Sequence, residues 1–134
     1  MMSRLLALFY FIAILSLAYS VKIKVANTMG HAVNVTATCS SSSNKIGPKF
    51  LEHDEAFEFD FTPFPLCIKA IETEFWCDVS TNTDKKAHFT AYKGCSPLNF
   101  GFFLRGEGVY NGTLSGDKIS FFQAWEMPEM KQEE

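Results

Sequence analysis

Three histidines are the side chains of this sequence that are best suited to acid–base chemistry at neutral pH. They are His31, His53 and His88. None belongs to HExxH, GxSxG or another motif with a known catalytic role, and a catalytic histidine needs a positioned nucleophile or partner. We therefore interpret all three as surface or turn residues, and we predict no catalytic residue.

Five carboxylates also cluster in the middle of the chain. Paired carboxylates can hydrolyse sugars, and clustered carboxylates can bind calcium. The ordinary alternative is a solvated loop that leads to the outer face of a strand, and we favour that interpretation. A small secreted hydrolase is the least favoured of the functions considered. The five residues are Glu52, Asp54, Glu55, Glu58 and Asp60.

Four cysteines could serve as disulfide partners or as metal ligands: Cys39, Cys67, Cys77 and Cys95. An even number of cysteines in a small domain from an oxidising compartment indicates two disulfides. Zinc sites usually contain closely spaced ligand pairs, and no CxxC pair occurs here. We predict disulfides, no metal site and no cofactor. Four cysteines permit three pairings, which stay open at this point.

The N-terminus has the organisation of a secretory signal peptide. Arg4 precedes an uncharged apolar run from Leu5 to Leu17, and Ala18 and Ser20 supply small residues before the predicted cleavage site. The run has 13 residues, whereas a membrane span needs about 20. A short membrane anchor is the alternative. We predict that residues 1–20 are removed and that the rest is secreted.

The mature chain is predicted to hold one domain, over residues 21–126, followed by a flexible acidic tail over residues 127–134. Without Arg4, 11 basic residues face 15 acidic ones, so the net charge changes from −3 to −4. A mildly acidic chain without a basic cluster argues against binding of nucleic acid or an anionic membrane. No second apolar run could insert into a membrane. We expect a monomer.

Period-two alternation dominates the mature sequence and predicts strands. The residues from Val21 to Val25 and from Val33 to Cys39 alternate between apolar and polar side chains. The clearest strand signal is Phe57, Phe59 and Phe61, which are separated by single carboxylates. Three phenylalanines on one face require a core opposite them and would contribute roughly 5–9 kcal/mol through burial.

Two further strands, Phe75–Val79 and Ala87–Tyr92, predict a hairpin in which Val79 lies opposite Ala87. Alternation places Trp76, Tyr92 and Tyr110 on outward faces. Seven or eight short strands in total predict an all-β fold, either a β-sandwich or a small barrel, stapled by two disulfides. The other predicted elements are a loop at Ser40–Pro48, strands at Leu66–Ile71, Asn99–Leu104 and Ile119–Trp125, and a turn at Asn111–Gly112.

Two N-glycosylation sequons fit a secreted protein: Asn34-Val35-Thr36 and Asn111-Gly112-Thr113. Alternation points Asn34 away from the core, toward solvent. Asn-Gly is a turn signal, and an exposed turn is accessible to a glycosyltransferase. We therefore predict N-glycosylation at both asparagines.

The ordered set of motifs resembles the plant self-incompatibility S1 family, also called S-protein homologues. Members begin with an extended segment ending in Asn, and carry an F-x-F strand, a T-x-F-x-C element, an F-x-x-Y strand and a late R-x-x-G-[IV]-Y turn. The resemblance covers nearly the whole mature chain. The matching segments are Lys22–Asn27, Phe57–Phe61, Thr73–Cys77, Phe89–Tyr92 and Arg105–Tyr110.

The cysteines depart from the family pattern, in which two cysteines follow the F-x-x-Y strand. Only Cys95 stands there, and Cys67 has no usual counterpart. Compared with the family pattern, Cys67 would take the place of the missing cysteine and pair with Cys95. The predicted hairpin register supports this, because it brings Cys95 near Ile71. Cys39 would then pair with Cys77.

The resemblance implies that the fold is a small antiparallel β-sandwich. It also implies a secreted, non-enzymatic recognition or signalling protein that acts as an extracellular ligand for a cell-surface partner. The best understood family members are pistil determinants that signal to incompatible pollen. Loops at the ends of the sandwich, such as Ser40–Pro48 and Thr81–Lys86, would carry the binding. The alternative functions are a secreted defence effector, an enzyme inhibitor or a carrier of a small ligand.

Overall fold

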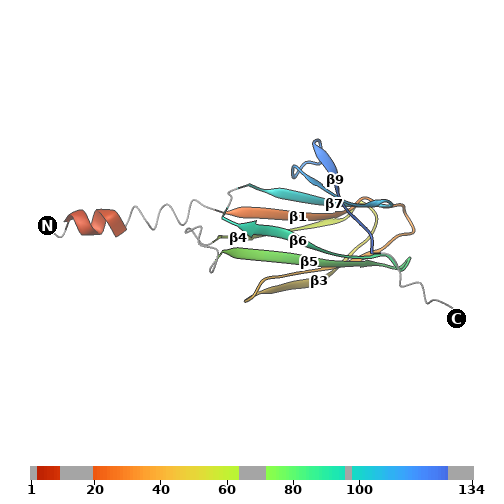
Figure 1. Cartoon of the computed structure of the whole chain (residues 1–134), viewed down its shortest axis with the longest axis horizontal. Helices are drawn as coiled ribbons and strands as arrows, with labels where there is room; N and C mark the ends of the chain where they lie inside the picture. The colour runs from red at the N-terminus through yellow and green to blue at the C-terminus, as the bar shows by residue number, and fades with distance from the viewer. Residues whose placement is uncertain (1–2, 10–19, 64–71, 96–97, 127–134) are drawn as a thin grey trace.

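A computed structural model describes residues 3–9, 20–63, 72–95 and 98–126, and these contain nine strands in two sheets. Figure 1 shows the sheets stacked face to face, with the strands along the long axis of the domain. This is the predicted all-β sandwich. The strands are β1 (Val21–Asn27), β2 (Val35–Ser40), β3 (Lys45–Leu51), β4 (Ala56–Phe61), β5 (Thr73–Thr81), β6 (Lys86–Gly94), β7 (Phe100–Arg105), β8 (Gly108–Gly112) and β9 (Ile119–Ala124).

One sheet has five strands in the order β4-β1-β7-β8-β9, and the other has four in the order β3-β2-β5-β6. Neighbours run antiparallel, as predicted, except for the parallel pair β1 and β7. This pair arises because the chain leaves β6 in one sheet and enters the other sheet beside β1 (Figure 1). Residues 3–9 are helical, and no helix within the described residues is long and apolar enough to cross a membrane.

The core forms where the alternating apolar residues of the two sheets meet. Val21, Ile23 and Val25 of β1 are fully buried, while Lys22 and Lys24 between them are not. The phenylalanines of β4 pack on the same core, as the sequence predicts. Their side chains contact the opposite sheet, where the ring centroid of Phe61 lies 4.5 Å from that of Phe75.

Asn27 is the polar exception in this core, with no exposed surface. Its side-chain nitrogen donates to the carbonyls of Val33 at 2.9 Å and Leu51 at 3.1 Å. Its side-chain oxygen accepts from the amide of Met29 at 3.0 Å. A buried amide is tolerated when its hydrogen bonds are made. Asn27 therefore ties the end of β1 to the following loop and to β3.

The predicted loop Ser40–Pro48 is wrong for most of its length, because Lys45–Leu51 forms strand β3. Only Ser41–Asn44 is a turn, closed by the bond from the Ser41 amide to the Asn44 carbonyl at 2.8 Å. β3 is an edge strand that is largely exposed and is interrupted by a bulge opposite Ala37 and Cys39. It therefore lacks the apolar alternation of a half-buried strand. With β3 included, the described residues hold nine strands rather than seven or eight.

The hairpin of β5 and β6 confirms the predicted register, since Val79 lies opposite Ala87. The register shifts between Phe75 and Trp76, so that β6 carries one extra residue at Ala91. A bulge of this kind reverses the side-chain alternation beyond it. Tyr92 is consequently 3% exposed, and its predicted outward position is wrong.

Cys39 and Cys77 form a disulfide between β2 and β5. They lie directly opposite each other in the ladder, with Cα atoms 4.0 Å apart and no exposed surface. This is one of the two expected pairings. Cys95 is also disulfide-bonded. Its expected partner Cys67 and the predicted strand Leu66–Ile71 lie outside the described residues, so the pairing of Cys67 with Cys95 stays a prediction.

Candidate recognition surface

The side of the four-stranded sheet that faces away from the core presents a continuous array of polar and aromatic side chains. Its members alternate with buried residues along β2, β5 and β6, and the strand register places them in rows across the sheet. We call this array the outer face. It consists of Thr36, Thr38, Ser40, Phe50, Trp76, Asp78, Ser80, Lys86, His88 and Thr90.

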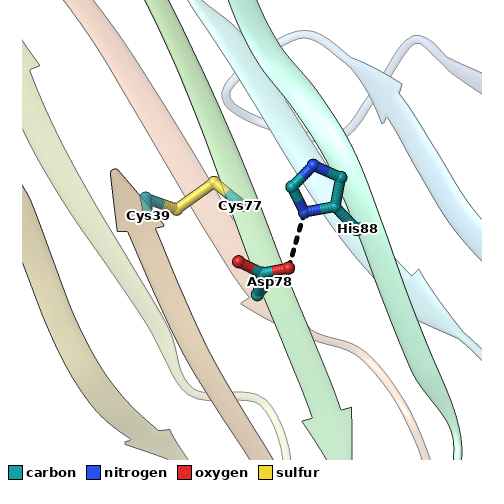
Figure 2. Close-up of a disulfide and its surroundings, with 4 residues drawn as sticks. All are labelled: Cys39, Cys77, Asp78 and His88. Atoms are coloured by element: carbon teal, nitrogen blue, oxygen red, sulfur yellow. Dashed lines mark hydrogen bonds and ion pairs between the residues drawn. A yellow bond between two sulfur atoms is a disulfide. The ribbon is translucent and has the colours of Figure 1, made fainter. Parts of the chain in front are cut away.

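Asp78 and His88 form the charged centre of the outer face (Figure 2). They are cross-strand neighbours, and Nδ1 of His88 lies 2.6 Å from Oδ1 of Asp78. Their side chains are 55% and 61% exposed, so the pair contributes little to stability. Its effect is to orient the imidazole. Nε2 of His88 makes no hydrogen bond to a described residue and stays available on the exposed side of the sheet.

Two aromatic side chains flank this pair. Phe50 on β3 is 75% exposed and sits beside Thr36, while half-buried Trp76 lies between Ser40 and Thr90. The indole nitrogen of Trp76 donates to no acceptor in the described part of the chain. Exposed aromatics on a rigid surface are frequent anchors of protein partners. Trp76 is therefore outward, as predicted, and Phe50 is an exposed aromatic side chain that the sequence did not indicate.

A shallow hollow of about 240 Å³ lies on the same face. Hydroxyl and charged side chains line it: Thr36, Thr38, Asp78, Ser80, Lys86 and Glu126. The disulfide lies directly beneath, since Cys77 precedes Asp78 on β5 (Figure 2). The polar hollow thus lies over a pair of strands that a disulfide joins covalently.

The loops expected to carry binding do not form one site. The Ser41–Asn44 turn follows the end of β2, whereas Thr81 lies opposite Val35 at the start of β2, so the two lie at opposite ends of the sheet. The turn after Thr81 is also internally bonded, because the Thr81 hydroxyl accepts from the amides of Thr83 at 3.2 Å and Lys85 at 3.1 Å. A rigid continuous face is the better candidate.

The remaining histidines contact each other, although they lie in different loops. His31 lies between β1 and β2, and His53 lies between β3 and β4. The rings of His31 and His53 lie 4.0 Å apart between centroids. His53 Nδ1 contacts the Met29 carbonyl, and its Nε2 lies 3.0 Å from Oδ2 of Asp54. These contacts join the loop before β2 to the loop before β4. They account for both histidines as local structural residues.

The carboxylates around Glu52 are engaged in similar local contacts. The Glu55 carboxylate accepts from the Glu52 amide at 2.9 Å, and Glu58 lies 3.7 Å from Lys22. Within the described residues no three His, Cys, Asp or Glu side chains gather into a potential metal site. The hollow on the outer face is lined by a different set of residues. The arrangement gives no support to the hydrolase interpretation.

The other predicted outward aromatic, Tyr110, lies on the opposite side of the molecule. It is half-buried on β8, with its ring 5.5 Å from Phe121 and 4.8 Å from the Arg105 guanidinium.

The two predicted glycosylation residues differ in their exposure to solvent. Asn34 is exposed just before β2, whereas Asn111 is half-buried within β8. The predicted turn at Asn111–Gly112 is therefore wrong, and the turn follows at Thr113–Lys118.

Known proteins share the sequence pattern and the fold. The model of the family "Plant self-incompatibility protein S1" matches residues 22–125. S-protein homolog 8 of Arabidopsis thaliana is 28% identical over 92 residues, which are 63% of this chain and 65% of that protein. The match thus spans slightly less than two thirds of that relative.

A solved structure of SPH (Self-Incompatibility Protein Homologue) proteins has the same fold. These proteins are described as a widespread family of small, highly stable, secreted proteins from plants. The TM-score is 0.55 at 15% sequence identity, and the match covers 81% of this chain and 96% of that chain. The sandwich described above is therefore the architecture of that group.

Proposed function

We propose that this chain, which belongs to the plant self-incompatibility protein S1 family, acts as an extracellular ligand that a cell-surface partner recognises through the outer face. The single observation that carries this proposal is the solvent-facing array of Phe50, Trp76, Asp78 and His88 on one rigid sheet. Such a face offers exposed aromatic side chains, an oriented histidine–carboxylate pair and a polar rim, which are features of protein interfaces.

The protein is secreted and extracellular, in keeping with its family. We propose that residues 1–20 are the cleaved signal peptide, that residues 21–126 are the folded domain and that residues 127–134 are a flexible acidic tail. The first strand supports this division, because β1 begins at Val21, which is fully buried. A cut a few residues further on would remove part of a core strand.

A binding role fits the exposed histidine–carboxylate pair better than a catalytic one. Asp78 and His88 stand on an open face, where water competes for every charge. Catalytic pairs gain their effect in enclosed sites that exclude water. We therefore propose a non-enzymatic, monomeric protein whose partner is a cell-surface or other extracellular protein and not a nucleic acid.

Binding to intact plant cells tests this proposal. The secreted protein, labelled at its C-terminus, should bind the surface of cells that respond to it in a saturable manner, and protease treatment of the cells should abolish the binding. Phe50→Ala should weaken binding at least about tenfold, as expected for an interface anchor. Phe121→Ala is the matched control, since Phe121 is 54% exposed on the other sheet.

Two results would contradict the proposal. Equal affinity of Phe50→Ala and the unaltered protein would remove the outer face from the binding site. Binding that survives protease treatment of the cells would exclude a protein partner.

A further inference from the structure

A groove opens at the edge of the sandwich where β6 faces β7, β8 and β9. It is a hollow of about 340 Å³ with a largely apolar lining, which includes Thr90, Phe100, Phe102, Asn111 and Phe122. A second hollow of about 520 Å³ adjoins it, because Phe100 and Asn111 line both. Lys118 and Ser120 give this second hollow a polar wall. The groove therefore passes from aromatic to polar surroundings, with Asn111 between them.

The aromatic part of the groove results from a bulge in β9. The register shifts so that Phe121 pairs with Tyr110 and Gln123 pairs with Val109, which leaves Phe122 without a cross-strand partner. The Phe122 ring instead lies 5.8 Å from Phe102 and 6.2 Å from Phe89, between the two sheets. It is still 40% exposed, so its outer surface lines the groove.

Among the described residues, two contacts cover part of the edge of β6. The Gln123 side chain donates to the His88 carbonyl at 2.8 Å, and the Glu126 amide donates to the Lys86 carbonyl at 2.8 Å. The groove begins beyond these contacts, next to Thr90. An exposed strand edge beside aromatic side chains is a site of unwanted association that proteins usually cover.

Asn111 is placed to supply that cover. It lies opposite Phe102 in the ladder of β7 and β8, so both side chains point to the same side of the sheet. Its side-chain amide makes no hydrogen bond to a described residue, unlike that of Asn27 in the core. It is also the acceptor residue of the sequon Asn111-Gly112-Thr113. The geometry points to an N-linked glycan on Asn111 whose first sugar fills this groove.

The attachment reaction uses a lipid-linked oligosaccharide diphosphate as donor. A bond forms between C1 of the first N-acetylglucosamine and Nδ2 of Asn111, the bond between C1 and the phosphate oxygen breaks, and the amide proton leaves with the lipid diphosphate. The transfer takes place on the chain while it enters the secretory compartment, before β8 has formed. The half-buried position of Asn111 in the folded domain is therefore no obstacle, and folding then carries the sugar into the groove.

The chemistry of the groove suits a pyranose ring. One face of N-acetylglucosamine exposes C–H groups that pack against aromatic rings such as Phe122 and Phe100, while its hydroxyls can reach Lys118 and Ser120. A hollow of about 340 Å³ lies at the small end of the ~300–1,000 Å³ range of ligand sites. It holds one or two sugar rings and leaves the rest of the glycan in solvent.

Asn34 provides the internal control. It is exposed before β2, and none of the three hollows described above is lined by it. A glycan on Asn34 would extend into solvent and contribute little to folding stability. The inference depends on neither Phe50 nor Asp78, so it stands or falls independently of the receptor role.

The experiment compares the full chain, secreted from a eukaryotic host, with its Asn34→Gln and Asn111→Gln variants. Loss of the Asn111 glycan should lower Tm by roughly 3–6 °C and raise the fluorescence of an added apolar dye, whereas loss of the Asn34 glycan should change neither. Trimming the unaltered protein to one N-acetylglucosamine per site should preserve Tm. An Asn111 without glycan, or a Tm insensitive to its glycan, would overturn the inference.

A second measurement covers the case in which Asn111→Gln is not secreted. A peptide N-glycosidase should release the Asn111 glycan from the native protein much more slowly than after denaturation. Phe122→Ala should accelerate the native release several-fold, whereas Phe121→Ala on the opposite side of the sheet should not. Equal release rates from the two variants would show that the sugar lies outside the groove.

Discussion

His88 lies directly opposite Asp78 across the ladder of β5 and β6, with 2.6 Å between Nδ1 and Oδ1. The neighbouring pair in the same ladder is Cys77 and Phe89, both buried in the core. Two adjacent rows therefore carry an exposed histidine–carboxylate pair and one end of a buried disulfide. Their contributions to stability are expected to differ greatly, and they can be measured separately.

Removal of the disulfide should be costly. A Cys39→Ala/Cys77→Ala double variant should lose about 4 kcal/mol in free energy of unfolding, since the bond closes a loop with a sequence separation of 38 residues. Asp78→Ala is the control on the same strand and should lose less than about 1 kcal/mol, because its contact with His88 is exposed. Urea denaturation of the three proteins measures both effects. Similar losses in the two variants would contradict the expectation that the disulfide stabilises the fold far more than the exposed Asp78–His88 pair does.

Asn27→Ala should also destabilise the domain strongly. The substitution leaves the Val33 and Leu51 carbonyls and the Met29 amide without their partner in a buried site. The expected loss is about 3 kcal/mol in free energy of unfolding. Asn44→Ala, in the exposed turn before β3, should be nearly neutral. A neutral Asn27→Ala in the same chemical denaturation series would show that the three bonds do not hold β1 in place.

Gly47→Ala tests the bulge of β3. Gly47 has φ of +108°, and a Cβ there would lie 2.8 Å from the Ala37 carbonyl oxygen. Strain in this backbone region should cost roughly 1–3 kcal/mol, and the contact adds to it. Gly106→Ala is the matched control, because no atom lies within 4 Å of its added Cβ. Thermal unfolding should separate the two variants by several degrees, and coincident curves would refute the strained position.

Acid titration tests the turn between β8 and β9. Hydrogen bonds from the hydroxyls of Ser115 and Thr113 lower the pKa of Asp117 below its usual 3.8. The carboxylate thus stabilises the folded turn above the unfolded pKa, and this contribution is lost as pH falls through the folded pKa. Ser115→Ala should return the pKa of Asp117 toward 3.8, measured by carboxyl-carbon NMR. Ser41→Ala, in a remote turn, should leave the pKa of Asp117 unchanged. If Ser115→Ala also leaves it unchanged, the Ser115 hydroxyl is not what lowers this pKa.

Elements with one buried face were predictable from the sequence. β1, β2 and β4 alternate apolar and polar residues because each contacts the core on one side only. The predicted opposition of Val79 and Ala87 also implies that of Asp78 and His88, since register is constant along a regular ladder. The charged centre of the outer face was therefore implicit in the hairpin prediction.

The misplaced elements lie where regular alternation breaks down. β3 is an exposed edge strand, so its sequence carries no core pattern, and the exposure of Phe50 could not be inferred. The bulge at Ala91 turns Tyr92 inward, where its ring centroid lies 4.9 Å from that of Phe61 on the other sheet. Asn111-Gly112 has the composition of a turn, but pairing with β7 and β9 holds it in a strand. Each case was decided by tertiary pairing rather than by local preference.

The parallel neighbour of β1 has a consequence for the order of folding. β1 is the first strand to be synthesised, yet Ile23 pairs with Phe59 on one side and with Phe100 on the other. The two backbone edges of β1 are therefore both hydrogen-bonded only after most of the domain, up to β7, has emerged. Such non-local pairing is typical of slow-folding β proteins. The domain should complete its fold only after β7 has been translocated, and one edge of β1 stays unpaired until then.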